Sequence, residues 1–172
     1  MTTRGIALLR EHAIEHEVLA YRYRKMGARI AADAVDQPAA IVLKSLVFQA
    51  NDGSFLFVLI GGDGSVSTRK LGRATGHKHV AAAAPRDAQR VTGYQVGGIS
   101  PLGARTRLPV VLDEAAAAHR SLILNAGARG ILVRVSTPAL IRLLEATIAD
   151  VRIEKTTGAR ARPPSTTLPS NS

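Results

Sequence analysis

The stretch Gly93-Tyr94-Gln95-Val96-Gly97-Gly98-Ile99-Ser100-Pro101-Leu102-Gly103 holds four glycines and a proline in eleven residues. This composition excludes a regular helix, because glycine tolerates positive φ angles and proline fixes φ and donates no backbone hydrogen bond. A Gly-Gly pair also lets a ligand approach the backbone closely. The stretch is therefore predicted to be an irregular loop that forms the floor of a binding site.

The segments around this loop alternate between strand and helix patterns. A helix is predicted over 85–92, with Pro85 at its first position, and a strand over 108–112. Hairpins mixed with helical crossovers predict one α/β (α+β) domain with a mixed sheet. The other expected strands are 17–21, 41–48, 55–60, 78–82, 121–125, 131–135 and 147–153, and the other expected helices are 6–13, 26–35, 67–74, 113–119 and 136–145.

Composition restricts the chemistry and the partners. A chain of 172 residues is long enough for one domain with a hydrophobic core. It contains no cysteine, which excludes disulfides, thiolate nucleophiles and cysteine-based zinc sites. The net charge of +10 favours a polyanionic partner, most simply nucleic acid, although excess cations can also serve only to keep a protein soluble.

The chain shows no feature of export or membrane insertion. Its first twelve residues, MTTRGIALLREH, lack a signal-peptide pattern, and no segment approaches the roughly 20 apolar residues of a membrane span. The cytoplasm is the expected location. The domain is expected to cover 1–153, and the tail 154–172, rich in Pro, Ser, Thr and Arg, is expected to be disordered.

Lys44 stands out among the charged residues. Strand alternation places it on the same face as Val42, Leu46 and Phe48. A lysine on an apolar face is either an edge residue whose ammonium reaches water or a functional ammonium held in a pocket. The spacing alone favours the first interpretation.

Ser100 does not fit the pattern of a serine nucleophile. The nucleophile elbow needs Gly-x-Ser-x-Gly, and here Gly103 comes one residue late. The elbow also uses the N–H after the serine as an oxyanion donor, and Pro101 has none. A hydrogen-bonding role within the loop is the better interpretation.

Neither a metal site nor a catalytic carboxylate is predicted. His77 and His79 would share one side of a short strand, but no nearby cysteine or carboxylate completes a ligand set, so two solvated histidines are expected. Asp113 comes directly before a predicted helix, and it is expected to act as an N-cap.

Several motifs together resemble one family. Residues 88–103, AQRVTGYQVGGISPLG, followed by Arg107-Leu108-Pro109 and Asp113, are similar to the YbaK-type Cys-tRNA(Pro) deacylases, part of the prolyl-tRNA-synthetase-associated editing domains. Lys44-Ser45-Leu46 resembles the family's Lys-Thr-Leu motif. The helix at 67–76 and the Gly turn at 125–130 also match, in the same order.

The resemblance implies a single-domain enzyme with a mixed, curved, barrel-like sheet flanked by helices. It would hydrolyse the ester of mischarged tRNA(Pro) in trans without metal or cofactor, the substrate cysteine's own thiol attacking the ester carbonyl. Lys44 would be the catalytic residue that orients the tRNA 3′ end. The residues that would contact the substrate are Tyr21, Met26, Gly97, Gly98, Ile99, Ser100, Pro101 and Gly127.

Two alternatives stay open at the level of sequence. One is a deacylase for Ala-tRNA(Pro) or another small aminoacyl-tRNA, and the other is a non-catalytic module that binds tRNA or a synthetase. The expected partner is the aminoacylated tRNA 3′ end, with prolyl-tRNA synthetase as a second candidate, and a monomer is expected. The tail cations Lys155, Arg160 and Arg162 either contact tRNA phosphates or are inert.

Overall fold

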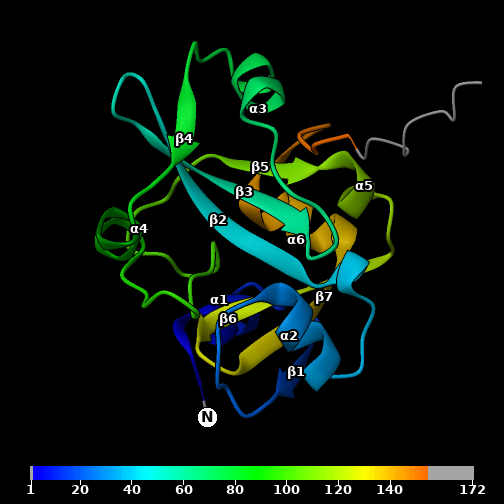
Figure 1. Cartoon of the computed structure of the whole chain (residues 1–172). Helices are drawn as coiled ribbons and strands as arrows, with labels where there is room; N and C mark the ends of the chain where they lie inside the picture. The colour runs from blue at the N-terminus through cyan, green and yellow to red at the C-terminus, as the bar shows by residue number, and fades with distance from the viewer. Residues whose placement is uncertain (1, 155–172) are drawn as a thin grey trace, which may run out of the picture.

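Strands and helices alternate along the chain in the computed structural model, which describes residues 2–154 (Figure 1). The strands are β1 His16–Ala20, β2 Leu43–Ala50, β3 Phe55–Gly61, β4 Val80–Ala82, β5 Val110–Asp113, β6 Ser121–Ala128, β7 Ile131–Ser136 and β8 Thr147–Ala149. The helices are α1 Arg4–Glu11, α2 Ala28–Ala34, the 3-10 turn η1 Ala39–Ile41, α3 Thr68–Thr75, α4 Pro85–Thr92, α5 Glu114–Ala117 and α6 Thr137–Leu144.

The strands form two sheets. One has the order β1-β7-β6 and is antiparallel, and the other has the order β4-β2-β3-β5-β8. In the larger sheet, β2 is antiparallel to β3 and β4, whereas β3–β5 and β5–β8 are parallel pairs. The mixed α/β fold predicted from the sequence is therefore confirmed.

The two sheets are joined through β2, and they do not close into a strict barrel. Within the described residues, one isolated parallel bridge, Val42 to Ile123, joins β2 to the smaller sheet. On its other edge β2 pairs with β3 from Leu43 to Gln49, but β4 begins to pair with β2 only at Phe48. Positions 44–46 of β2 thus have a neighbouring strand on one side only, and the ladder is open there.

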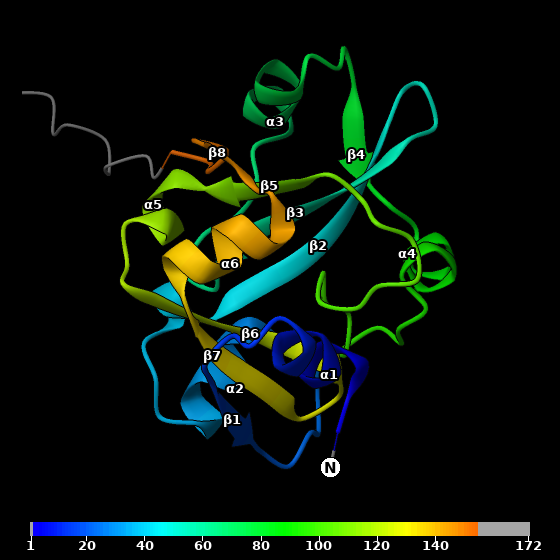
Figure 2. The same cartoon turned by 180° about the vertical axis from the view of Figure 1, so that it is seen from behind.

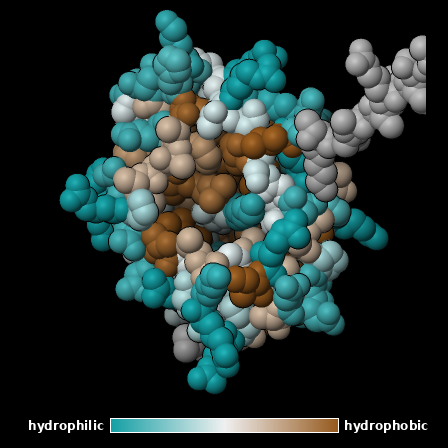
Figure 3. Space-filling model, in the orientation of Figure 1, coloured by the Kyte–Doolittle hydropathy of each residue, from teal (hydrophilic) through white to brown (hydrophobic). Residues whose placement is uncertain are grey.

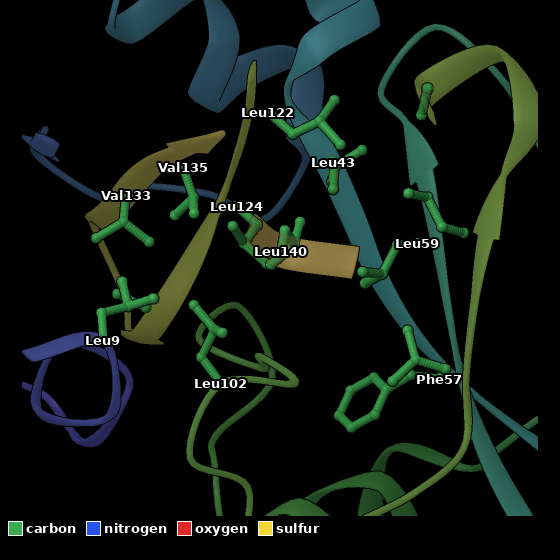
Figure 4. Packing of buried hydrophobic residues seen from close by; sticks show 14 of the residues in the cluster. Leu9, Leu43, Phe57, Leu59, Leu102, Leu122, Leu124, Val133, Val135 and Leu140 are labelled. Carbon is green, nitrogen blue, oxygen red and sulfur yellow. The ribbon is translucent and has the colours of Figure 1, made fainter. Parts of the chain in front are cut away.

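The main core lies between the two sheets. Figure 4 shows side chains from both sheets converging on one another, among them Leu43 and Leu59 from the larger sheet and Leu124 and Val133 from the smaller one. Seen from behind, α1 and α6 cover this core (Figure 2). Burial of such side chains is the dominant favourable contribution to folding, at about 25 cal/mol per Å² of apolar surface.

Two smaller clusters cover the outer faces of the sheets. Ala31 and Ala32 of α2 pack on Ile123 and Leu132, across the smaller sheet from the main core. Leu71 of α3 packs with residues of the larger sheet, including Val58. Strand β2 and the residue before it contribute to all three clusters, so the alternating side chains of this segment connect the whole domain.

The helix ends follow the local sequence rules. The Ser67 hydroxyl accepts from the Lys70 N–H, and the Ser136 hydroxyl accepts from the Ala139 N–H, as N-caps do. Gly76 ends α3 in the left-handed conformation, with φ 75°. Pro85 occupies the first turn of α4. The place predicted for Pro85 at the start of its helix is confirmed.

Three local predictions are wrong. The strand expected at 78–82 begins only at Val80, so His77 and His79 lie in the irregular segment before it rather than on a strand. Asp113 stands at the N-cap position of α5, but its side chain makes no capping hydrogen bond within the described residues. Strand β8 ends at Ala149, four residues before the expected end. The tail from 155 onward lies outside the described residues.

Candidate functional site

A cavity of about 410 Å³ opens at the unpaired edge of β2. Its wall is mostly apolar and small, with Ala28, Ala31, Ala83 and Ala88 from the segments around the strand. Figure 3 shows hydrophobic side chains gathered in a hollow in the middle of this face and hydrophilic ones around it. A cavity of this size, mostly apolar with a few polar groups, is typical of small-ligand sites.

Among the described residues, Lys44 is the only one with a charged side chain that lines the cavity. It is half-buried, and its ammonium donates to the carbonyl oxygen of Gly64 at 2.5 Å. Burial lowers the pKa of Lys44, the nearby Arg29 lowers it further, and Asp63 acts in the opposite direction. One carbonyl therefore holds the ammonium at the edge of an apolar wall. Lys44 is partly exposed, as expected of an edge lysine that reaches water, and it also lines a pocket, as expected of a functional ammonium.

The Gly-rich loop forms the opposite wall. Gly97 and Ile99 line the cavity, together with Val96. The loop is held by side chains from β6 and the β6–β7 turn: Asn125 Nδ2 donates to the Gly97 carbonyl at 3.1 Å, and Arg129 Nε donates to the Val96 carbonyl at 3.0 Å. The loop that was predicted to be the floor of a binding site does border the cavity.

The close approaches at the Gly-Gly pair are made by the protein itself. A Cβ on Gly97, whose φ is 91°, would lie 2.5 Å from the Tyr23 hydroxyl oxygen. A Cβ on Gly98 would lie 3.1 Å from the Arg129 backbone nitrogen. Both glycines thus permit tight packing of the loop against neighbouring segments. The sequence alone had suggested a different reason for them, the close approach of a ligand.

The predicted site residues divide into two groups. Tyr21, Met26, Lys44, Gly97 and Ile99 line the cavity together. Burial, with a smaller contribution from Tyr23, raises the pKa of Tyr21, so its phenol stays protonated as a hydrogen-bond donor over the physiological range. Met26 is 57% exposed at the rim.

The remaining predicted residues form the second group, which does not line this cavity. The Ser100 side chain is fully buried, and its hydroxyl accepts from the Leu102 N–H at 3.0 Å, so it supports the loop from below. Gly98 and Pro101 are buried in the loop. Gly127, with φ 105°, packs against the Tyr94 ring.

Asn125 is a residue of the site that sequence analysis missed. Its Oδ1 accepts from the N–H groups of Gly127 and Ala128 at 2.7 and 3.1 Å, where β6 has a register irregularity. Its amide therefore joins a bulge in β6 to the Gly-rich loop. The glycine turn that follows Asn125 is the feature of the sequence that could have indicated this role.

Basic residues alternate with lining residues along one side of the cavity mouth. The segment from the end of β1 into α2 carries Arg22, Arg24, Lys25 and Arg29, all exposed. Among the ion pairs within residues 2–154, none involves these four. Arg129 stacks over the Tyr23 ring at 5.2 Å on the same rim. The rim is thus suited to an anionic ligand.

A larger and more open hollow of about 780 Å³ lies between the end of α1, β1 and α6. None of the predicted site residues lines it. Its Arg134 is paired with Glu17 at 3.2 Å. Its lining has no counterpart in the motifs of the sequence, so the smaller cavity is the candidate site.

Two further properties concern metals and membranes. Within residues 2–154, no three His, Asp or Glu side chains come close enough together to hold a metal ion. No helix in that same part of the chain has the length and apolar character needed to cross a membrane.

Comparisons with known proteins point to one family. A family model described as "Aminoacyl-tRNA editing domain" matches residues 26–143, more than half of the chain. A provisionally named Cys-tRNA(Pro)/Cys-tRNA(Cys) deacylase, EbsC of Enterococcus faecalis, is 24% identical over 87% of this chain and 92% of its own length. The proline–tRNA ligase of Lactobacillus acidophilus is 30% identical over 56% of this chain, which spans only 17% of that ligase.

A solved structure shares the fold. It is described, again provisionally, as a trans-editing enzyme for prolyl tRNA synthetase, with 25% identity and a TM-score of 0.78. The match covers 90% of this chain and 99% of that one.

We predict that Lys44→Met leaves the fold intact and is neutral or stabilising at pH 7. The lowered pKa means that the native state holds the charged lysine at a cost. That cost is relieved as pH rises from the lowered native value toward about 10.5, the ordinary pKa of the unfolded state. As pH rises over that window, the unfolding free energy of wild type should therefore increase relative to that of Lys44→Met.

Urea unfolding followed by circular dichroism over pH 7–11 measures this difference. Lys78→Met, at an exposed position, corrects for the removal of one positive charge. A Lys44→Met variant that is strongly destabilised at pH 7 would contradict the prediction.

Proposed function

Because this chain belongs to the family of aminoacyl-tRNA editing domains, we propose that it is a trans-editing deacylase that hydrolyses the ester of mischarged Cys-tRNA(Pro). The observation that carries the proposal is the cavity, in which Lys44 faces an apolar wall and the backbone of Gly97. The activities for which EbsC and the similar solved structure are named support the same reaction class.

The cavity lining favours a reaction in which the substrate supplies its own nucleophile. The chain has no cysteine, and within residues 2–154 no histidine or carboxylate lines the cavity. The Ser45 hydroxyl is buried and has no hydrogen-bond partner in that part of the chain, so no base activates it there. The Ser100 hydroxyl is committed to the loop. Catalysis can then come from positioning the substrate and stabilising charge.

The proposed reaction proceeds in two steps. The cysteine sulfur attacks its own ester carbonyl carbon, the bond to the ribose oxygen breaks, and the thiol proton ends on that oxygen. The products are tRNA with a free hydroxyl and a cyclic cysteine thioester. Water then opens the thioester to free cysteine. No oxidant or cofactor is required.

Lys44 and the loop would divide the work of positioning. The Lys44 ammonium would hold the anionic 3′ end of the tRNA. The Gly97 N–H makes no hydrogen bond within the described part of the chain, so it is available to the ester oxygen as charge develops there. Both groups lie on elements fixed by hydrogen bonds from their neighbours.

The basic rim fits the tRNA partner. The ester sits on the terminal ribose, so the nearest phosphates must lie just outside the cavity, where Arg22, Arg24, Lys25 and Arg29 are exposed. Contacts of this kind strengthen binding without reading sequence. We propose that selectivity for tRNA(Pro) comes from prolyl-tRNA synthetase acting beside this chain, since a similar segment lies within proline–tRNA ligases.

The proposal extends to assembly and location. We propose that the protein acts as a monomer. We propose the cytoplasm as its location, since aminoacyl-tRNA is the proposed substrate.

Ala-tRNA(Pro) is the second candidate substrate. Small alanine side chains form much of the wall, and none of the described lining groups is specific for a thiol. Such a wall accepts a methyl group as readily as a thiol. The reaction would then require water as the nucleophile.

We expect the full chain to deacylate Cys-tRNA(Pro) faster than Ala-tRNA(Pro) and to spare Pro-tRNA(Pro). The measurement is a deacylation panel with Cys-, Ala-, Ser- and Pro-tRNA(Pro). Lys44→Ala should abolish most of the activity. Equal or faster turnover of Ala-tRNA(Pro) would identify Ala-tRNA(Pro) as the substrate. If no ester is turned over, the chain is a non-catalytic module that binds tRNA or a synthetase.

Ser100→Ala should keep the rate at saturating Cys-tRNA(Pro) within about threefold of wild type. The change leaves the buried Leu102 N–H without its acceptor, which costs about 1–3 kcal/mol of stability but removes no reacting group. Steady-state kinetics and thermal unfolding separate the two effects. A covalent aminoacyl-Ser100 trapped by acid quench would refute the mechanism.

The double variant Arg24→Gln/Lys25→Gln should raise KM at low salt and leave kcat unchanged. The slope of log(kcat/KM) against log salt should fall by about 0.7 for each phosphate that these side chains no longer neutralise. Arg10→Gln/Arg142→Gln removes the same charge from α1 and α6, on the other side of the molecule (Figure 2). Identical salt curves for the two double variants would exclude the rim as the phosphate-binding surface.

A further inference from the structure

The segment that follows β8 lies along the loop between β3 and α3. The Ser67 N–H donates to the Val151 carbonyl at 2.7 Å, and the Ile153 N–H donates to the Ser65 carbonyl at 2.9 Å. Val66 and Arg152 form an isolated antiparallel bridge between these two hydrogen bonds. Arg152 is therefore fixed beside the loop by backbone contacts on both sides.

The Arg152 guanidinium joins two carboxylates. Its Nε donates to Asp113 Oδ2 at 3.2 Å, and its Nη1 donates to Asp63 Oδ1 at 3.1 Å. The side chain of Asp113 is only 1% exposed, and its Oδ1 accepts from the Val151 N–H. A buried carboxylate is strongly destabilising without a cation, so Asp113 holds the guanidinium in one position.

The guanidinium also packs directly against Gly64. A Cβ on Gly64 would lie 2.5 Å from Arg152 Cζ and 2.7 Å from Nη1. The Gly64 carbonyl is the acceptor of the Lys44 ammonium. Contacts therefore run without a break from buried Asp113 through Arg152 and Gly64 to the lysine that lines the cavity.

We propose that Arg152 is a positioning residue for Lys44. Its guanidinium packs against the turn at Gly64 and fixes the position of that turn. The Gly64 carbonyl in turn holds the Lys44 ammonium at the cavity wall. The inference rests on the proposed deacylase function for its activity assay. It assigns a role in the site to a residue that lies outside the cavity and outside the matched family segment.

The physical need for such a residue comes from the lysine side chain. Its flexible four-carbon stem lets the ammonium move over a wide range, and burying the charge favours its escape to water. A single carbonyl acceptor resists this only if the carbonyl itself is fixed. Misplacement of a catalytic group by about 1 Å can cost on the order of 100-fold in rate.

The test uses two variants of the full chain that disturb the contact from opposite sides. Arg152→Gln removes the guanidinium. Gly64→Ala keeps every charge but places a methyl group where the guanidinium packs, and Gly64 is not among the glycines with positive φ, so alanine fits its backbone. Both should lower kcat/KM for Cys-tRNA(Pro) by about 10- to 100-fold.

Arg107→Gln is the matched control, because Arg107 forms an exposed pair with Glu145 at 2.9 Å. It should keep wild-type kcat/KM. Arg152→Lys, which retains the charge without the planar fork, should recover only part of the activity.

Arg152→Gln can fail to fold, because it leaves Asp113 buried without its cation. The double variant Arg152→Gln/Asp113→Asn removes both charges and should restore the thermal midpoint while leaving activity low. If this folded double variant, or Gly64→Ala, has wild-type kcat/KM, the proposal is wrong.

A second readout separates positioning from a general decrease in stability. In protein with reductively ¹³C-methylated lysines, which keep their charge, the Lys44 signal should move to the position of exposed lysines in Gly64→Ala and stay in place in Arg107→Gln. In a Lys44→Ala background, adding Gly64→Ala should lower any residual single-turnover rate by less than about twofold. An unmoved Lys44 signal would overturn the inference.

Wild-type protein is assayed beside every variant. If wild type deacylates none of the four esters, the proposed function fails, whereas the Lys44 signal still decides whether Arg152 positions the lysine. If wild type is active and the variants match it, only the positioning role fails.

Discussion

The single bridge that joins the two sheets within the described residues, between Val42 and Ile123, is the constraint on which the architecture depends. It ties the start of β2 to the smaller sheet, while the end of β2 pairs with β4 in the larger one. A strand that serves two sheets in this way leaves part of one edge without a partner. The cavity lies at that part, so the site is a direct result of how the sheets are joined.

The open edge places one ammonium against an apolar wall. Side chains from three clusters meet around β2, and electrostatic interactions are stronger beside such apolar surroundings than in water. One ammonium, rather than a set of catalytic acids and bases, then dominates the local field. A substrate that carries its own nucleophile suits such a site, because the protein has only to hold it.

Much of the fold could be predicted from local sequence patterns. Ser67, Pro85 and Ser136 act as their residue types predict, since caps depend on the nearest turn alone. The boundaries of β6 could not be predicted in the same way. The strand continues to Ala128 because the Asn125 side chain stabilises an irregularity within it, and that contact depends on tertiary structure.

The site was predictable only in part, for a related reason. Motif resemblance identified Lys44 and the loop at Gly97, both of which border the cavity. Asp113 was expected to cap a helix, because a carboxylate before a helix usually does so. Its true partner, Arg152, lies in the last described segment, and pairing between such distant positions leaves no periodic pattern to read.

The contact between Asp63 and Arg152 also orders events during synthesis. The two residues are 89 positions apart. At about 5–20 residues per second, a ribosome needs on the order of ten seconds to add the arginine after the aspartate. Lys44 and its acceptor Gly64 are therefore synthesised well before the segment whose guanidinium packs against that acceptor, so this part of the structure can be completed only late in synthesis.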